Sequence, residues 1–127
     1  MEKFLRSDGR LGIILKLSIP PHGQATLQSY DDFDDIKKTE AMMLEVQSNW
    51  ATLWPNMLQL LEEAIVDWEV EVDLEEEEFE MGISNIRPGY FMSDQADYLI
   101  SFELGDEGPS WDYFIKGDNI IHFQPCH

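Results

Sequence analysis

Carboxylates are the side chains in this sequence with the clearest capacity for chemistry, and they gather in one stretch. Between residues 66 and 75 apolar and acidic residues alternate, and acidic residues continue to position 80. The acidic members, called the acidic run below, are Asp67, Glu69, Glu71, Asp73, Glu75, Glu76, Glu77, Glu78 and Glu80. Because successive side chains of a β-strand point to opposite faces, the alternation predicts a strand with one apolar and one wholly acidic face.

The predicted acidic face repels itself. Alternate residues on a strand lie about 6 to 7 Å apart, so each neighbouring pair of carboxylates repels by about 0.6 kcal/mol in water. The chain offers few cations in return, since no Lys, Arg or His occurs between Lys38 and Arg87, and Lys16 and Lys116 are the basic residues in predicted strands. We therefore predict that the acidic run binds a basic protein, which would relieve the repulsion. The alternative is a solvated sheet face that stays soluble and resists edge-to-edge pairing.

A second acidic cluster raises the alternative of a divalent-cation-binding protein. Asp31, Asp32, Asp34 and Asp35 could offer hard oxygen ligands to Ca²⁺ or Mg²⁺. The cluster lacks the Asp-x-Asp-x-Asp-Gly loop and the distal glutamate of a calcium site. Since a predicted helix follows directly, capping of the helix N-terminus explains the aspartates better. We therefore assign no metal ligand here.

Histidine and cysteine give weaker signals. His122, Cys126 and His127 have the donor atoms that zinc prefers, but no fourth ligand is evident in the sequence. The sequence contains no Gly-x-Ser-x-Gly, no Gly-x-x-x-x-Gly-Lys and no His-Glu-x-x-His. We expect a binding role with no cofactor and no catalytic residue. A small enzyme that uses carboxylates, His22 or His122 is the other alternative.

Two elements in the first half of the chain would position these groups. Residues 11–19 alternate apolar and other side chains up to Pro20-Pro21-His22-Gly23, which predicts a strand. From about residue 36 to 65 apolar residues recur every three or four positions, which predicts a helical stripe. Pro55 lies within the stripe, so we expect one kinked helix or two helices that meet near Trp54.

The second half of the chain predicts a series of strands. Alternating patterns cover residues 66–74, 79–86, 98–104, 111–116 and 119–123, and Gly117-Asp118 joins the last two in a hairpin. Short connections favour antiparallel pairing. We predict a single α+β domain over residues 1–127, with a five- or six-stranded antiparallel meander sheet and the helical segment of about residues 36–65 on one face.

The tryptophans divide between core and surface. Trp50, Trp68 and Trp111 fall on predicted inward faces and are expected in the core. Trp54, beside Pro55, is the tryptophan that we expect to be exposed. Phe33, between paired aspartates, either packs onto the helix or forms an exposed anchor.

Composition sets the class of partner. With 26 acidic and eight basic residues the formal net charge is −18, which disfavours nucleic acid and anionic membrane surfaces as partners. No apolar run is long enough to span a bilayer, and a single cysteine suits the cytoplasm. In size, acidity and predicted α+β pattern the chain resembles bacterial immunity proteins and anti-toxins that block cationic nuclease toxins, and proteins that mimic nucleic acid. The resemblance implies an immunity- or inhibitor-type role and assigns no functional residue.

Overall fold

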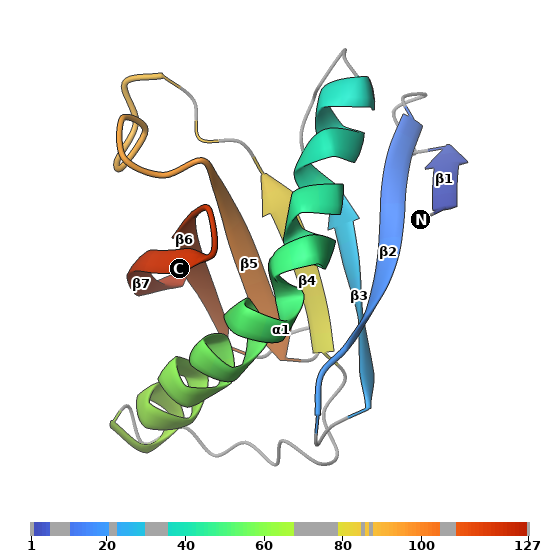
Figure 1. The fold of residues 1–127 in the computed structure, drawn as a ribbon. Coiled ribbons are helices and arrows are strands. Elements are labelled where there is room, and N and C mark those ends of the chain that lie inside the picture. Colours follow the sequence, from blue (N-terminus) through green and yellow to red (C-terminus); the bar gives the residue numbers. More distant parts are fainter. Residues whose placement is uncertain are drawn as a thin grey trace.

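The computed structural model describes residues 2–5, 11–20, 23–29, 36–67, 79–84, 86, 88–104 and 109–126. This part of the chain forms one helix and seven strands in a single sheet, and the strands lie in the sheet in their sequence order (Figure 1). The elements are β1 (Glu2–Leu5), β2 (Leu11–Ser18), β3 (Gln24–Ser29), α1 (Ile36–Asp67), β4 (Phe79–Ser84), β5 (Tyr98–Leu104), β6 (Ser110–Lys116) and β7 (Asn119–Cys126).

The α+β class and the mostly antiparallel sheet are confirmed, whereas the strand number and the simple meander are not. Strands β1 and β3 add to the predicted set, and β3 pairs with β4 in parallel, while every other neighbouring pair is antiparallel. The parallel pair has a physical reason. Helix α1 connects β3 to β4, and it carries the chain back along the sheet so that β4 starts at the same end as β3.

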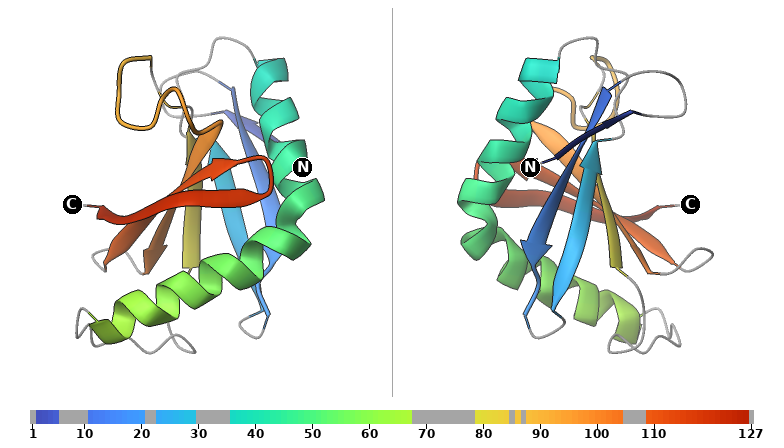
Figure 2. Two further views of the ribbon diagram at one scale, coloured as in Figure 1. Left: turned by 60° about the vertical axis from the view of Figure 1, so that its left-hand side comes forward. Right: turned by 90° about the vertical axis from the view of Figure 1, so that its right-hand side faces the viewer.

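Helix α1 is one element of 32 residues with Pro55 inside it. Its axis bends in the middle, as both views of Figure 2 show, so the prediction of a kink is confirmed in the form of a single bent helix. Proline lacks the N–H that would bond to the carbonyl of Ala51, and its ring crowds that carbonyl. Next to the bend, the Asn56 side-chain amide donates to the Thr52 carbonyl at 3.1 Å.

The helix runs two residues further than predicted and corrects the start of the acidic strand. Val66 and Asp67 form the end of α1, and Val66 is 74% exposed rather than directed into the core. The buried helical stripe continues through Leu61 and Ala64. Val66 and Asp67 therefore follow the helical pattern, not the strand-like alternation that begins at Val66. The remainder of the predicted strand, residues 68–78, lies outside the described residues.

Helix α1 covers one face of the sheet (Figure 2). Alternate strand residues meet it in a core that includes Ile13, Leu15, Leu17, Leu27, Met81, Ile83, Tyr98, Ile100, Phe102, Trp111, Tyr113 and Ile115. The helix contributes Met43, Val46, Trp50, Leu53, Trp54, Met57 and Leu61. The expected burial of Trp50 and Trp111 is confirmed. The expected exposure of Trp54 is wrong, because this side chain is only 4% exposed.

Candidate protein-binding surface

The second half of helix α1 carries three exposed carboxylates, Glu62, Glu63 and Asp67, called the acidic helix end below. The last turn of the helix contains no basic residue. Since the C-terminal end of a helix dipole is negative and favours cations, Asp67, the last residue of α1, lies where negative charge is least favourable. The acidic helix end therefore combines three exposed carboxylates with the negative end of the helix dipole.

Within the described part of the chain, none of these three carboxylates pairs with a lysine. The ion pair between Lys3 Nζ and Glu40 Oε1, at 2.7 Å, lies in the first half of the helix and ties edge strand β1 to it. Glu63 instead accepts a hydrogen bond from the Gln59 amide at 3.3 Å. The acidic helix end thus has no cationic partner among the described residues.

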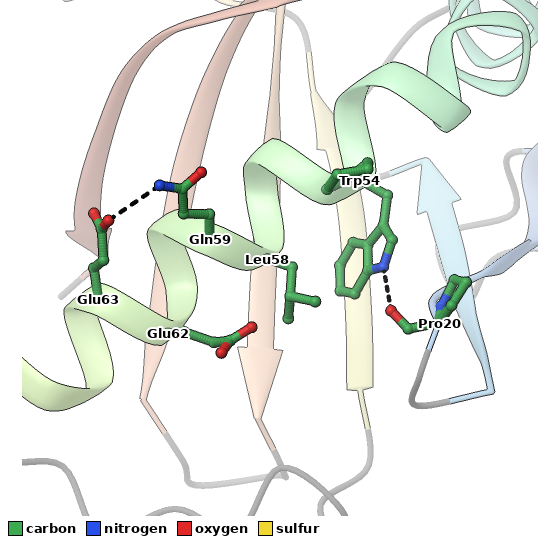
Figure 3. Close-up of a pocket in the computed structure, with 7 residues that line it drawn as sticks. Pro20, Trp54, Leu58, Gln59, Glu62 and Glu63 are labelled. Carbon is green, nitrogen blue, oxygen red and sulfur yellow. Dashed lines mark hydrogen bonds between the residues drawn. The ribbon is translucent and has the colours of Figure 1, made fainter.

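A groove of about 450 Å³ lies beside the acidic helix end, between the bend of α1 and the end of β2 (Figure 3). Glu62 and Glu63 form one end of this helix groove, and its apolar lining comes from Pro20, Trp54, Pro55 and Leu58. The buried Trp54 indole N–H donates to the Pro20 carbonyl at 2.9 Å. The hydrogen bond fixes one wall of the groove to Pro20, two residues beyond the end of β2. An apolar surface and two carboxylates thus line the same groove.

Two residues of the acidic run have described positions. Asp67 is the last residue of α1 and is exposed, and Glu80 lies near the start of β4 and is half-buried. Figure 1 places the end of α1 and the start of β4 toward the same end of the molecule. The other members, Glu69, Glu71, Asp73, Glu75, Glu76, Glu77 and Glu78, lie outside the described residues.

Glu80 has an acidic neighbour that the sequence analysis did not identify. It pairs in register with Glu103 of β5, on the sheet face that points away from the helix, and both side chains are half-buried. Like charges directly opposite each other on neighbouring strands are destabilising. Lys16 lies on the same face but is separated from Glu80 by Thr26 of β3. The alternation of residues 98–104 was a signal that Glu103 faces outward, but the register of the pair could not be read from it.

The histidine candidate belongs to an aromatic cluster. His122 of β7 forms a 3.1 Å hydrogen bond between Nε2 and Gln124 Oε1, and its ring lies 5.0 Å from Phe91 and 5.5 Å from Phe114. Within the described residues, no three His, Cys, Asp or Glu side chains come together as metal ligands. Cys126 ends β7, while His22, His127 and the aspartates of residues 31–35, with Phe33, lie outside the described part.

An aromatic loop, residues 88–95, was not identified by the sequence analysis either. Tyr90 and Phe91 are 65% and 58% exposed, and the Phe91 ring meets Phe114 edge-on at 5.6 Å. Met92 has a φ of 64°, in the left-handed region that side chains rarely adopt. Backbone hydrogen bonds from Ser93 N to the Tyr90 carbonyl and from Ala96 N to the Met92 carbonyl hold this conformation.

Two buried tyrosines have pKa values raised well above the ordinary range, and neither suits acid–base catalysis. Burial raises the pKa of Tyr98 most, and the nearby carboxylates of Glu45 and Asp97 add to it. Burial alone raises the pKa of Tyr113. The Tyr113 hydroxyl donates to the Met57 carbonyl at 2.9 Å, whereas the buried Tyr98 hydroxyl has no hydrogen-bond partner among the described residues. Both phenols therefore stay protonated at neutral pH.

Comparisons with models of known protein families, with curated proteins and with solved structures give no significant match. Among the described residues, no helix is both long and apolar enough to cross a membrane.

Proposed function

We propose that this protein is an acidic binding module of the immunity or inhibitor type, which engages a basic protein through a surface that joins the acidic run to the acidic helix end. The observation that carries the proposal is the end of α1. Glu62, Glu63 and Asp67 are exposed there, the last turn has no basic residue, and no described lysine pairs with them.

A basic partner would reduce two unfavourable electrostatic interactions, one at the end of α1 and one within the acidic run. Cationic side chains at the end of α1 would interact with the carboxylates and with the negative end of the helix dipole. They would also reduce the repulsion among the closely spaced carboxylates of the acidic run. Such a surface steers a basic protein towards itself, so the association rate would fall steeply as salt is added.

Half-buried carboxylates strengthen the electrostatic argument. Glu80 and Glu103 face each other on neighbouring strands, where they are less screened by water than fully exposed side chains. Like charges placed directly opposite each other on neighbouring strands are in general destabilising. A bound arginine or lysine would be attracted to both carboxylates, and this attraction would offset the repulsion between them.

A capture experiment with matched charge changes tests the proposal. Immobilised protein is incubated with lysate of the source cells at low ionic strength, and captured basic proteins are purified and titrated against the free protein at several salt concentrations. The test variant combines Glu69→Lys, Glu71→Lys and Asp73→Lys. The control combines Glu45→Lys, Asp94→Lys and Asp118→Lys, three exposed acidic residues elsewhere, and changes the net charge equally.

The affinity of the test variant should fall by tenfold or more, about the effect of losing close charge pairs, while the control should stay within about threefold of the wild type. Equal losses in both variants would show that net charge, not this surface, drives the association. Capture of no basic protein would contradict the proposal itself.

A further inference from the structure

We infer that the helix groove receives an extended segment of the basic partner in which a leucine-sized apolar side chain is separated by one residue from an arginine or lysine. The inference rests on the proposed function and names the part of the partner that this site would recognise. It depends on four features of the groove: fixed walls, an apolar floor, the spacing of the floor from the carboxylates, and their charge.

The walls of the groove are fixed before any ligand binds. Trp54 is buried, its indole N–H is held by the Pro20 carbonyl, and its ring stacks on Trp50 with the ring centroids 5.7 Å apart. The Trp50 indole N–H in turn donates to the Ser18 carbonyl at 2.6 Å. A binding surface whose side chains are already ordered loses little conformational entropy when a ligand binds.

The floor offers apolar surface to a ligand. Leu58 is half-buried in the groove, and Pro55 lies exposed one turn before Gln59. Figure 3 shows the Leu58 side chain directed away from the helix axis between Trp54 and Glu62. An apolar side chain placed here would cover Leu58 and lie against the Trp54 wall.

Helix geometry sets the spacing of the ligand's two side chains. Glu62 follows Leu58 by four residues, which corresponds to about 6 Å along a helix. Alternate side chains of an extended peptide lie about 6 to 7 Å apart. An extended segment that follows the helix axis can thus place an apolar side chain on Leu58 and the next side chain on the same face beside Glu62.

Charge selects a cation for the second side chain. No described lysine pairs with Glu62 or Glu63, and Gln59 holds the Glu63 carboxylate by its hydrogen bond. Arginine can bind a carboxylate through two parallel hydrogen bonds. A second copy of this chain suits the groove poorly, because the net charge of −18 opposes self-association.

Synthetic peptides test the inference directly. Four nine-residue peptides with the same Gly/Ser flanks carry Leu-Ser-Arg, Arg-Ser-Leu, Ser-Ser-Arg or Leu-Ser-Glu at the centre. Each is titrated at low salt into ¹⁵N-labelled protein, and the indole N–H signal of Trp54 reports binding in the groove. The tighter of the two peptides that contain both leucine and arginine should bind about tenfold more tightly than either peptide that lacks one of them.

Matched variants locate the binding site. Glu62→Lys should weaken the best peptide about tenfold, while Asp94→Lys, the same charge change at an exposed residue of the aromatic loop, should leave the affinity within about twofold of the wild type. Leu58→Ser should remove the advantage of the leucine and keep the salt dependence of binding. The amide spectrum of each variant checks that it is folded.

Each remaining outcome overturns the inference. If the Ser-Ser-Arg peptide binds as tightly as the best peptide, the groove recognises charge alone, and the proposed basic partner is unaffected. If no peptide shifts the Trp54 signal, the groove accepts no such segment, while the capture experiment still decides the proposed function separately. Equal losses for Glu62→Lys and Asp94→Lys would place the binding outside the groove.

Discussion

The helix groove and the aromatic loop both have aromatic residues near the surface, but they differ in how their exposed groups are compensated. In the aromatic loop, Phe91 packs edge-on against Phe114 and His122, so contacts within the protein account for its position. In the helix groove, Glu62 and Glu63 have no cationic partner among the described residues. Uncompensated charge beside apolar surface, rather than exposed aromatic rings alone, marks the candidate binding site.

The two regions also bear different costs. Met92 holds a left-handed backbone conformation that costs an L-residue about 1 to 2 kcal/mol, and the hydrogen bonds of the aromatic loop offset it. The acidic helix end bears an electrostatic cost, because Gln59 offers Glu63 a neutral hydrogen bond and no described cation pairs with its carboxylates. Hydrogen bonds within the loop thus offset the backbone strain at Met92. The carboxylates of the acidic helix end, by contrast, have no cationic partner among the described residues.

The largest expected effect concerns the wall of the groove. Trp54→Ala should lower the free energy of unfolding by about 3 to 5 kcal/mol, because it removes a large buried side chain. Trp54→Phe should cost less, since it keeps most of the packing and loses the hydrogen bond to Pro20. Urea unfolding followed by circular dichroism measures both. A loss below about 1 kcal/mol for Trp54→Ala would mean that the wall is not part of the core.

The aromatic loop should respond more weakly. Phe91→Ala should lower the free energy of unfolding by about 1 to 2 kcal/mol, because it removes edge contacts from a partly exposed ring. Tyr90→Ala, at a similarly exposed ring, should change stability by less than about 0.5 kcal/mol. Neither variant should alter peptide binding at the groove. A clear loss of peptide affinity in Phe91→Ala would break the distinction between the two regions.

Local patterns predicted much of the fold, and long-range contacts account for the rest. The alternation of β2, β5 and the β6–β7 hairpin was readable because large apolar residues mark their inward faces. Strand β3 was missed because Leu27 is the one large apolar residue among its inward positions, beside Ala25 and Ser29. Without β3, the crossover through α1 and the parallel pairing to β4 could not be predicted.

The sequence predicted the type of side chain at the candidate site but only part of its location. The acidic composition pointed to carboxylates, but the alternating pattern begins after Glu62 and Glu63 and therefore did not mark them. The absence of basic residues near the helix end was a signal for them that could be read from the sequence. The burial of Trp54 was not readable, because its partner Pro20 lies 34 residues away. A groove formed by two segments far apart in the sequence can be recognised only from the tertiary structure.

Removal of the hydroxyl group should change stability in opposite directions at the two buried tyrosines. Tyr113, whose hydroxyl bonds to Met57 in the helix half that forms the groove, should lose about 1 kcal/mol of stability as Tyr113→Phe. Tyr98, which begins β5 after the aromatic loop, should gain about 1 kcal/mol as Tyr98→Phe, because its buried hydroxyl has no described partner. Thermal unfolding measures both, and a loss in Tyr98→Phe would reveal a hydrogen bond to its hydroxyl.

Alkaline pH tests the same pair. Both pKa values are raised in the folded protein, so folding favours the protonated phenols. Their contribution is fully present below the unfolded pKa of about 10 and is lost as the pH rises through the folded values. Wild-type stability should therefore fall above about pH 10, and each Tyr→Phe variant should show a shallower fall. An unchanged slope in both variants would contradict the raised pKa values.

The smallest expected effect is on the free energy of unfolding at the helix end, and it tests whether negative charge there lowers stability while it favours binding. Asp67→Lys places a cation at the last residue of α1, where it should interact favourably with the helix dipole and with Glu63. The free energy of unfolding should rise by about 0.3 to 1 kcal/mol at low salt, and the gain should shrink as salt screens the charges. Urea unfolding at two salt concentrations measures the change.

Asp94→Lys is the matched control, because Asp94 is exposed but lies in the aromatic loop, away from the end of a long helix. It should change stability by less than about 0.5 kcal/mol. If both substitutions stabilise equally, the gain comes from the lower net negative charge of the whole protein. If Asp67→Lys alone stabilises the fold while weakening capture of the basic partner, the negative charge at the helix end serves recognition at the expense of stability.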